Sequence, residues 1–166
     1  WKFATMLKNS MNIGTGSITL KNDYRVTKIG SFLRKTKINE LPQIINILVG
    51  EISLVGPRPL IRRTFELYEL SHQKIIFSMK PGLTGIGSII FRNEEEILNN
   101  TEMNLEDYYK KYITPYKANL EIWYKKHQNL QCDLKIIFLT AWVIIFKNSK
   151  LPWIFFKELP LDPKEI

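Results

Sequence analysis

Two short segments of this chain combine residue types that can handle a metal-bound phosphate. The first is Asn39-Glu40 at the start of an expected helix, and the second is the turn Pro57-Arg58-Pro59. Free amides and the helix dipole favour anions at a helix N-terminus. A carboxylate there can also hold Mg²⁺, which often binds through carboxylates plus substrate phosphates. The prolines stiffen the backbone around Arg58, whose planar guanidinium suits bidentate contacts with phosphate oxygens.

Each segment also has a purely structural interpretation. Asn39 is a favourable N-cap, in which case Glu40 only complements the helix dipole. Arg58 can equally pair with a nearby acid on a surface turn. Arg34 lies five residues before Asn39 and can reach the same pocket, but an arginine at a helix C-terminus is also an ordinary dipole partner. The pattern alone leaves these alternatives open.

The other charged, aromatic and glycine-rich segments favour structural roles. Residues 81–87 form a glycine-punctuated loop that lacks the Gly-Lys-[Ser/Thr] ending of a phosphate-binding loop. The run Glu94-Glu95-Glu96 indicates a solvated turn, and Asp133 is more typical of a helix cap than of a ligand. The tyrosines of the long helix after Asn104 are more often packing residues: Tyr108, Tyr109, Tyr112 and Tyr116.

The composition describes one basic domain. A length of 166 residues suits a single domain over 1–166, and 45% hydrophobic residues suffice for a core. The formal net charge of +8 predicts anionic partners: phosphate esters, nucleic acid or an acidic lipid surface. Because the basic residues are dispersed and no nucleic-acid motif is present, we expect no nucleic acid as a partner.

Several further classes of site and segment are excluded or disfavoured. Cys132 is the only cysteine, so no intrachain disulfide forms, and the two distant histidines argue against a zinc site. The longest uncharged apolar run, 136–146, falls well short of the roughly 20 residues that a membrane-spanning helix needs. The chain begins with Trp1 in what reads as the middle of a strand, so we expect the natural protein to start earlier.

Periodicity predicts a compact, helix-rich α/β (α+β) domain with a few short strands. In the helix that starts at Asn39 and ends at Gly50, an apolar stripe is expected to be buried: Leu41, Ile44, Ile45 and Leu48. The long helix after Asn104 is expected to kink or break at Pro115. The expected helices are 27–35, 39–50, 62–74, the one from 104 onward and 134–146. The expected strands lie near 2–6, 52–55 and 88–91.

The C-terminal tail has the composition of a segment at a water–lipid boundary. Residues 150–156 read Lys-Leu-Pro-Trp-Ile-Phe-Phe, with lysines on both sides. Indole rings and long basic side chains reach lipid headgroups at such a boundary. We therefore expect residues 148–166 to form a membrane-surface tail.

Six motifs occur in order along the chain, five of them within a region of about residues 2–98. They are Lys2-Phe3-Ala4-Thr5-Met6, Arg25-Val26-Thr27-Lys28-Ile29-Gly30-Ser31-Phe32-Leu33-Arg34, Asn39-Glu40-Leu41-Pro42-Gln43, Gly50-Glu51-Ile52-Ser53-Leu54-Val55-Gly56-Pro57-Arg58-Pro59-Leu60, Lys80-Pro81-Gly82-Leu83-Thr84-Gly85 and Asp133-Leu134-Lys135-Ile136. Together they resemble the bacterial sugar transferases, the monotopic polyprenyl-phosphate phosphoglycosyl transferases.

The resemblance implies an activity and a location. Such enzymes transfer a sugar-1-phosphate from a UDP-sugar to undecaprenyl (polyprenyl) phosphate and release UMP. This step initiates bacterial surface polysaccharide or glycoconjugate synthesis. The resemblance also implies Mg²⁺ as cofactor, the cytoplasmic face of the bacterial inner membrane as location, an N-terminal membrane hairpin before Trp1, and a homodimer as one option.

The resemblance also assigns roles to residues. It implies that Glu40 binds Mg²⁺, Arg58 holds a phosphate and Arg34 supports the site. The predicted catalytic group is Asn39, Glu40 and Arg58. The predicted substrate-binding residues are Arg34, Pro57, Pro59, Arg92 and Asp133.

Asn39 departs from the family pattern, in which an aspartate precedes the glutamate and acts as the nucleophile. An amide is a poor nucleophile because its nitrogen lone pair is delocalised and it carries no charge. Three explanations remain open: Glu40 is the nucleophile, the lipid phosphate attacks directly, or the chain is inactive. Ala4 also departs from a common arginine, and we favour a natural variant. The alternative to an active transferase is an inactive membrane-surface module that binds polyprenyl phosphate or UDP-sugar.

Overall fold

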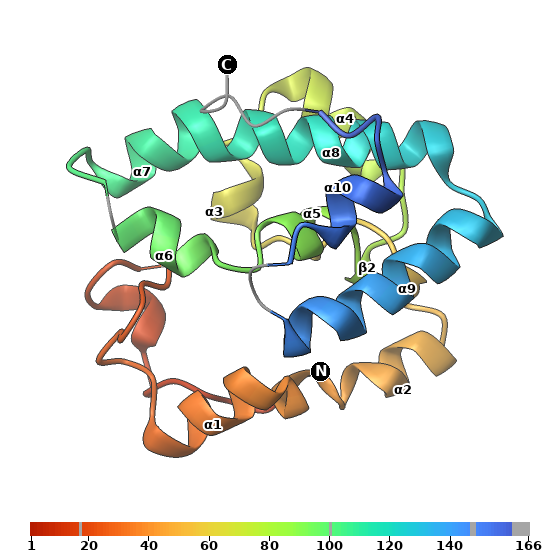
Figure 1. The fold of residues 1–166 in the computed structure, drawn as a ribbon. Helices are drawn as coiled ribbons and strands as arrows, with labels where there is room; N and C mark the ends of the chain where they lie inside the picture. The colour runs from red at the N-terminus through yellow and green to blue at the C-terminus, as the bar shows by residue number, and fades with distance from the viewer. Residues whose placement is uncertain (17, 100, 147–148, 161–166) are drawn as a thin grey trace.

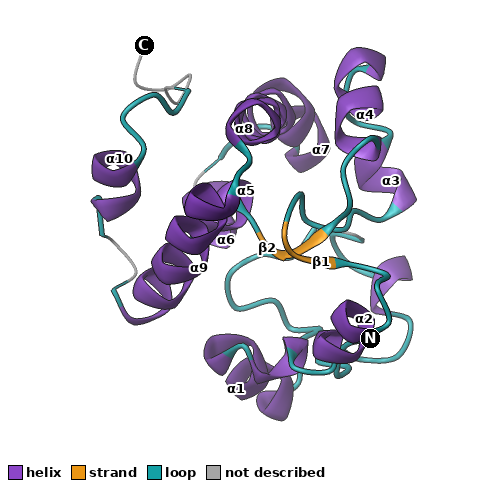
Figure 2. Ribbon diagram, turned by 90° about the vertical axis from the view of Figure 1, so that its right-hand side faces the viewer, coloured by secondary structure: helices purple, strands orange, loops and turns teal. Residues whose placement is uncertain are grey.

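A two-stranded parallel sheet lies at the centre of a helical domain (Figures 1 and 2). The computed structural model describes residues 1–16, 18–99, 101–146 and 149–160. Strand β1 (Ser53–Val55) pairs with β2 (Gly82–Thr84), with Ser53 opposite Gly82 and Val55 opposite Thr84. Figure 2 shows the strands with α8 and α9 on one side, α3 and α4 on the other, and α1 and α2 below. The expected helix-rich α/β class is confirmed.

The described residues form ten α-helices, two 3₁₀ turns and one π-helical turn. The first half contains η1 (Ser10–Asn12), α1 (Lys28–Thr36), η2 (Ile38–Glu40), α2 (Gln43–Leu48), α3 (Arg62–Phe65) and α4 (Leu70–Phe77). The second half contains α5 (Ile86–Ile90), α6 (Glu94–Asn99), α7 (Leu105–Tyr108), the π-helical turn Tyr109–Ile113, α8 (Thr114–His127), α9 (Leu130–Ile145) and α10 (Leu151–Phe155). Among these described helices, none combines the length and the apolar character needed to cross a bilayer.

The core forms where α5 packs against both α8 and α9. Four of its side chains are completely buried: Ile86, Leu120, Ile136 and Leu139. The C-terminal segment joins this core, because Phe156 and Leu159 are buried in it. In α10, by contrast, Trp153, Ile154 and Phe155 are exposed. The tail predicted over 148–166 is therefore partly packed into the domain, and its residues 148 and 161–166 lie outside the described residues.

The predicted strands were only partly right. The extended segment near 52–55 is confirmed as β1, but residues 88–91 belong mostly to helix α5. Residues 2–6 contribute only an isolated antiparallel bridge between Met6 and Val26. Strand β2 was predicted as part of a glycine loop. A short apolar run such as Ile89-Ile90-Phe91 fits a buried strand and a buried helix equally well, and a three-residue strand among glycines carries no periodic signal.

Helix α1 is confirmed, and the next helix differs from its prediction. The Thr27 hydroxyl caps α1 by accepting from the Gly30 amide at 2.9 Å. Asn39 does not cap a helix, because it lies inside the 3₁₀ turn η2 and α2 begins only after Pro42. The chain turns at Gly50, as expected, with a left-handed φ of 78° that suits glycine.

The side of α2 that faces the domain is polar, opposite to the prediction. Gln43 and Asn46 are each 7% exposed. Asn46 donates to the Glu51 carboxylate at 2.5 Å, and its carbonyl accepts from the Glu51 amide at 2.9 Å, so it secures the turn after the helix. The stripe predicted to be buried is exposed, up to 80% at its last residue: Leu41, Ile44, Ile45 and Leu48.

The helix predicted over 62–74 is two helices. Tyr68 is buried between α3 and α4, and its carbonyl accepts from the Gln73 side chain at 2.7 Å. Burying this ring turns the chain and ends α3. The predicted cap at Asn104 is confirmed, since its side chain accepts from the Glu106 amide at 2.9 Å. Pro115 does not break the helix that follows, because a π-helical turn precedes it and Pro115 then falls in the first turn of α8.

Arg25 organises the loop that precedes α1. Its side chain is fully buried and its Nη2 lies 2.6 Å from Asp23 Oδ2. The ion pair is nearly closed to water, and hydrogen bonding to Arg25 lowers the pKa of Asp23 to about 2. The guanidinium also donates to four backbone carbonyls of the loop: Ser10, Ile13, Gly16 and Ile18.

We predict that Arg25→Leu destabilises the chain by roughly 3–5 kcal/mol, because it leaves a buried carboxylate and four carbonyls without their donor. Urea unfolding followed by circular dichroism measures the change. The matched control is Lys21→Ala in the same loop. Its ion pair with Glu96 is about half exposed, so the loss should stay below about 1 kcal/mol. Equal losses in both variants would contradict the role given to Arg25.

Candidate active site

A close approach of two backbones positions Arg58. The Gly56 amide donates to the Thr84 carbonyl at 2.9 Å, and the Gly82 amide donates to the Pro57 carbonyl at 2.8 Å. A Cβ on Gly82 would lie 2.2 Å from the Gly56 nitrogen, and one on Gly85 would lie 2.3 Å from the Gly56 oxygen. Only glycine fits at these positions. The chain therefore leaves β1 in a fixed direction, with Pro57 buried and Arg58 exposed.

Glu40 lies opposite this turn. Its carboxylate oxygen Oε1 is 3.4 Å from Arg58 Nη2 and 3.4 Å from Lys2 Nζ. The Glu40 side chain is 14% exposed, whereas that of Arg58 is 49% exposed. The structure thus brings together the two residues that the sequence placed at the centre of the site.

The neighbouring cations keep Glu40 ionised. Burial disfavours its charged form, but the positive charges of Arg58, Lys2 and Lys37 outweigh that effect and hold the pKa of Glu40 below its usual range. The same crowding acts on the lysines in the other direction. Burial and the charge of Arg58 lower the pKa of Lys2, and burial is the main cause that lowers the pKa of Lys37 to about 8.

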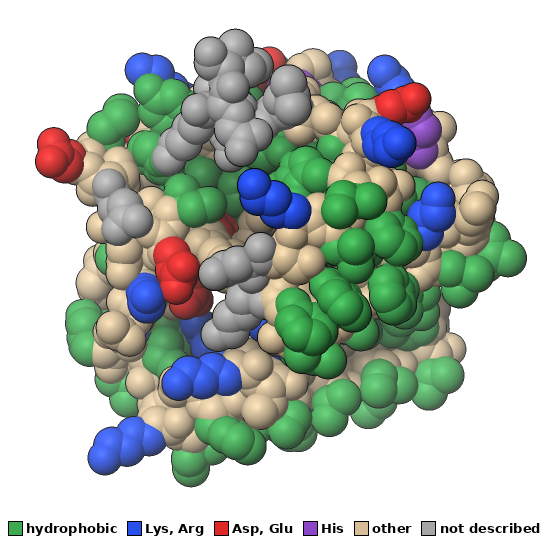
Figure 3. All heavy atoms as spheres, viewed as in Figure 1, with side chains coloured by type: hydrophobic (Ala, Val, Ile, Leu, Met, Phe, Trp, Pro, Cys, Tyr) green, Lys and Arg blue, Asp and Glu red, His purple; other side chains and the backbone are tan. Residues whose placement is uncertain are grey.

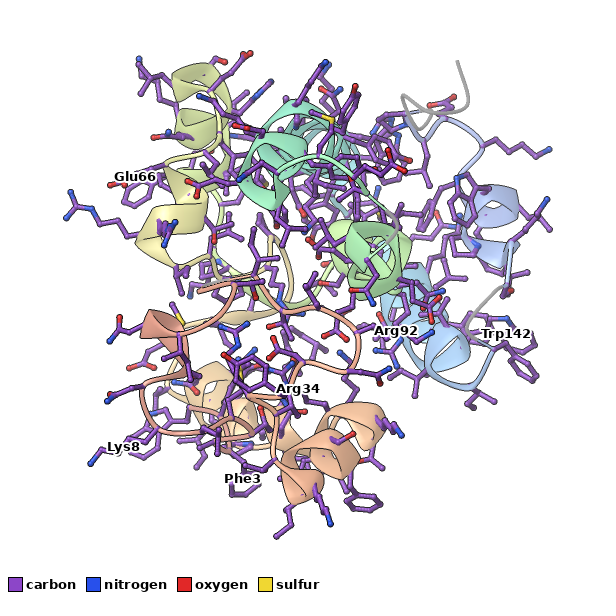
Figure 4. All side chains as sticks on the ribbon, turned by 90° about the vertical axis from the view of Figure 1, so that its left-hand side faces the viewer. Phe3, Lys8, Arg34, Glu66, Arg92 and Trp142 are labelled. Atoms are coloured by element: carbon purple, nitrogen blue, oxygen red, sulfur yellow. The ribbon has the colours of Figure 1, made fainter. Side chains whose placement is uncertain are left out.

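Arg34 and Arg92 complete the basic side of the site. Arg34 Nε donates to the Thr5 hydroxyl at 2.9 Å, and its Nη1 lies 3.6 Å from Glu95 Oε1. Burial lowers the pKa of Arg92 although both Glu40 and Glu95 act to raise it, so Arg92 belongs to the same electrostatic cluster. In Figure 4 the labelled Arg34 and Arg92 lie between the orange part that carries α1 and the green helices above it.

The fully assembled cluster has an excess of positive charge. Five basic side chains surround two acidic ones, giving a net charge of three positive units at neutral pH: Lys2, Arg34, Lys37, Arg58 and Arg92 against Glu40 and Glu95. They come from four separate stretches of the chain. Such a cluster suits an anionic ligand with more than one charge, such as a diphosphate.

Asn39 is held by its backbone rather than by its side chain. Its carbonyl accepts from the Phe3 amide at 3.0 Å. Its side-chain oxygen Oδ1 is buried and has no hydrogen-bond donor among the described residues. An amide oxygen left in this state next to Glu40 is available to a cation or to a ligand that can donate.

Asp133 lies elsewhere. It is not the cap of α9, because Asn129 caps that helix by accepting from the Cys132 amide at 2.9 Å. The Asp133 carboxylate accepts instead from the Tyr124 hydroxyl at 2.8 Å. It lines a pocket of about 510 Å³ with Ser53 and Val55 of β1, and no residue of the basic cluster lines that pocket.

A partly buried ion pair stabilises the α5–α6 junction, which carries Arg92 and leads to Glu95 in the first turn of α6. Lys117 of α8 lies 2.7 Å from the Glu94 carboxylate and 2.9 Å from the Tyr109 hydroxyl. Its ammonium also lies 4.9 Å from the centre of the Phe91 ring. Because Phe91 and Glu94 flank Arg92, these contacts fix where the junction presents its charges.

The prediction from the sequence did not include three members of the cluster: Lys2, Lys37 and Glu95. Lys2 lies in a quoted motif and Lys37 lies two residues before Asn39, so proximity in sequence could have indicated both. Glu95 was taken as part of a solvated acidic turn, and only its pairing with Arg34 distinguishes it. Pro59 is exposed beside Arg58, and Pro57 acts by positioning that arginine.

Comparison with known proteins shows the family to which the chain belongs. Residues 1–147 match the family model described as bacterial sugar transferase, and the chain belongs to that family. A sugar transferase of Haemophilus influenzae without an assigned activity is 39% identical over 130 residues, which cover 78% of this chain and 24% of the relative. A UDP-galactose-lipid carrier transferase of Erwinia amylovora is 38% identical with the same coverage.

A third relative has a more detailed name. It is the UDP-glucose:undecaprenyl-phosphate glucose-1-phosphate transferase of Escherichia coli, 37% identical over 149 residues, which cover 85% of this chain and 28% of the relative. The chain thus spans about a quarter of the length of these three relatives.

We predict that Gly85→Ala lowers stability by roughly 2 kcal/mol or more, because its Cβ would lie 2.3 Å from a backbone oxygen of Gly56. Urea unfolding measures the loss. The control is Ser88→Ala in the adjacent helix. Its hydroxyl is buried and has no partner within the described part of the chain, so its removal should be nearly neutral. A Gly85→Ala variant as stable as Ser88→Ala would show that the two backbones can separate without cost.

Proposed function

We propose that the protein containing this chain transfers a sugar-1-phosphate from a UDP-sugar to undecaprenyl or another polyprenyl phosphate, releases UMP and so initiates bacterial surface polysaccharide or glycoconjugate synthesis. The observation that carries the proposal is the ionised Glu40, held 3.4 Å from both Arg58 and Lys2 within a cluster of excess positive charge. The names of the Erwinia and Escherichia relatives support this substrate class.

The residues of the cluster suit phosphoryl transfer. Such a reaction requires little covalent chemistry from the protein and depends on positioning and on charge stabilisation. Arg58, on its stiff turn, would hold the diphosphate, while Arg34 and Arg92 would bind its other oxygens. Fixed positive groups stabilise the charge that develops on the leaving UMP phosphate without having to reorganise.

The residues present fit Mg²⁺, the proposed cofactor. Glu40 is an ionised oxygen ligand, and the buried Asn39 Oδ1 is a second oxygen with no donor among the described residues. No group of three or more His, Cys, Asp or Glu side chains is placed to bind a metal in the described residues. Mg²⁺ would therefore be held by Glu40 together with substrate phosphates, where it supplies charge neutralisation.

Asn39 restricts the covalent chemistry. Its amide carries no charge and cannot replace a carboxylate nucleophile. The phosphoryl group must then pass either to Glu40 or directly to the lipid phosphate. A second function follows from the same residue, namely a membrane-surface module that binds UDP-sugar or polyprenyl phosphate without turnover.

The exposed apolar side chains support a position on the cytoplasmic surface of the bacterial inner membrane. In Figure 3 green side chains gather over α9 and along the lower edge of the molecule, where α1 and α2 lie in Figure 1. Exposed apolar patches of this kind are typical of interaction surfaces. The exposed residues are Ile29 and Phe32 on α1, Ile44, Ile45 and Leu48 on α2, and Leu134, Phe138 and Ile145 on α9.

We predict Mg²⁺-dependent release of UMP by the full-length protein in lipid with undecaprenyl phosphate and one member of a panel of UDP-sugars. Glu40→Gln and Arg58→Ala should each lower the rate by about 100-fold or more, because each removes a charge that acts on the reacting phosphates. The matched control is Arg62→Ala. This neighbouring arginine is 92% exposed, and Glu66 is its one ion-pair partner among the described residues, so the rate should be unchanged.

Asn39→Asp, assayed in parallel, separates the two candidate functions. Turnover by the native sequence establishes the transferase. An intact-mass increase with UDP-sugar alone would show a covalent phosphosugar intermediate, and its loss in Glu40→Gln would support Glu40 as the nucleophile. If the native protein releases no UMP and Asn39→Asp does, the result would favour the binding module. Full activity in Glu40→Gln would remove the proposed metal role.

We predict that Ile45→Asn combined with Leu48→Asn weakens binding of the 1–166 chain to anionic lipid vesicles by roughly 10-fold or more. Each side chain would lose its transfer into an apolar environment, about 1.5–3 kcal/mol per residue when fully buried. Vesicle sedimentation measures binding, and the midpoint of thermal unfolding should stay unchanged because both residues are exposed. Leu70→Asn is the control. It is 75% exposed on α4, on the opposite edge in Figure 1, and should not alter binding.

A further inference from the structure

Helix α8 carries a buried acidic side chain, Glu121, that lies outside the basic cluster. The residue is 7% exposed, and its carboxyl group lies against helix α5. A Cβ on Gly87 of α5 would lie 2.7 Å from Glu121 Oε1. The carboxyl group therefore occupies the space beside a residue that has no side chain, at the contact between two helices of the core.

One oxygen of Glu121 has no hydrogen-bond donor. Oε2 is buried and has no partner among the residues that the structure describes. Lys117 lies one turn earlier on the same helix, but its ammonium already makes three hydrogen bonds. Two go to the Glu94 carboxylate at 2.7 Å and 2.8 Å, and one goes to the Tyr109 hydroxyl at 2.9 Å. An ammonium has three N–H donors, so none remains for Glu121.

An ionised carboxylate at this position would be unfavourable. A charge that is taken out of water without a donor or a cation of its own costs far more free energy than a neutral acid, so such a group keeps its proton. The effect on Glu121 has this direction. Burial raises its pKa to about 7, although the charge of Lys117 acts to lower it.

The other described groups that face Glu121 are uncharged near neutral pH. Helix α5 reads Ile-Gly-Ser-Ile-Ile and has no titratable side chain. Tyr68, which precedes α4, and Tyr124, three residues further along α8, both interact with Glu121, and burial is the main cause that raises the pKa of each. The charges beside this carboxyl group are therefore those of Lys117 and its partner Glu94, which neutralise each other.

We propose that Glu121 is a pH-sensitive element of the fold: it is a neutral acid while α5 and α8 are packed together, and its ionisation loosens this contact. Helix α5 ends at Ile90, two residues before Arg92, so the loosening acts on the segment that joins the core to the α5–α6 junction. The proposal does not depend on the transferase activity, because it concerns the packing of two helices.

The direction of the pH dependence follows from where the carboxyl group releases its proton. When α5 separates from α8, Glu121 meets water and its pKa returns to the ordinary value of 4.5, whereas the packed form holds the proton up to about pH 7. Below pH 4.5 both forms are protonated and the contact has its full strength. Between the two values only the opened form is ionised, so opening becomes about tenfold more favourable for each pH unit. Above pH 7 both forms are ionised and the dependence levels off.

Hydrogen exchange measured by mass spectrometry on the full-length protein in nanodiscs tests the proposal. The exchange rate of peptides that cover α5 is divided by the rate of the same peptides in Glu121→Gln at the same pH, which cancels the intrinsic effect of pH on exchange. This ratio should rise by roughly 10-fold or more between pH 5.5 and pH 7.5, because glutamine resembles the neutral acid and does not ionise. The control is Glu102→Gln, an exposed glutamate before α7, which should exchange as the native protein does.

A ratio that stays constant from pH 5.5 to pH 7.5 would overturn the proposal. Should Glu121→Gln fail to fold, Glu121→Met takes its place in the same ratio, since an apolar side chain of similar length removes the titrating group and suits a buried position. The measurement can be made whether or not the protein releases UMP. Failure of this inference therefore leaves the proposed function untouched, and the reverse also holds.

Discussion

The structure depends on the contact between two stretches of backbone at Gly56, Gly82 and Gly85. Two short strands could not form a stable sheet by themselves, and here they are held in place by α5, α8 and α9, which build the core around them. The absence of side chains at the three glycines lets the chain leave β1 directly above the start of β2. This contact fixes the backbone that carries Arg58. The tightest packing in the fold therefore lies next to a central residue of the candidate site.

The site itself is an assembly of positive charges with too few acids to neutralise them. Glu40 faces both Lys2 and Arg58. Glu95 faces Arg34, which also donates a hydrogen bond to Thr5. Folding thus stores an unfavourable electrostatic arrangement, which a phosphorylated ligand of the proposed kind would relieve. The partly buried Lys117–Glu94 pair has a different role, because its ammonium packs over the rings of Phe91 and Tyr109 and it holds the α5–α6 junction on α8.

The sequence correctly predicted features that depend on neighbouring residues, such as helix ends, caps and turns. The end of α1 near Lys35, the cap at Asn104, the turn at Gly50 and the proximity of Glu40 to Arg58 were all correct. Strand β2 was missed because three residues carry no periodicity, and Tyr68 divided a predicted helix because its burial depends on distant helices. The apolar period of α2 was real, but periodicity does not say which medium the apolar face meets. Asp133 was linked to the site by a motif, whereas its position is set by the start of α9 and by Tyr124.

The polar inner side and apolar outer side of α2 have a consequence for how such an enzyme would meet its acceptor. Glu40 lies in the turn immediately before this helix, so any surface that covers Leu48 and Ile45 also sets the height of the carboxylate above that surface. If that surface is a bilayer, the charged site rests at the level of the lipid headgroups. The search for a polyprenyl phosphate then takes place in two dimensions. Its rate would follow the mole fraction of the acceptor in the membrane and its lateral diffusion, rather than its concentration in the surrounding water.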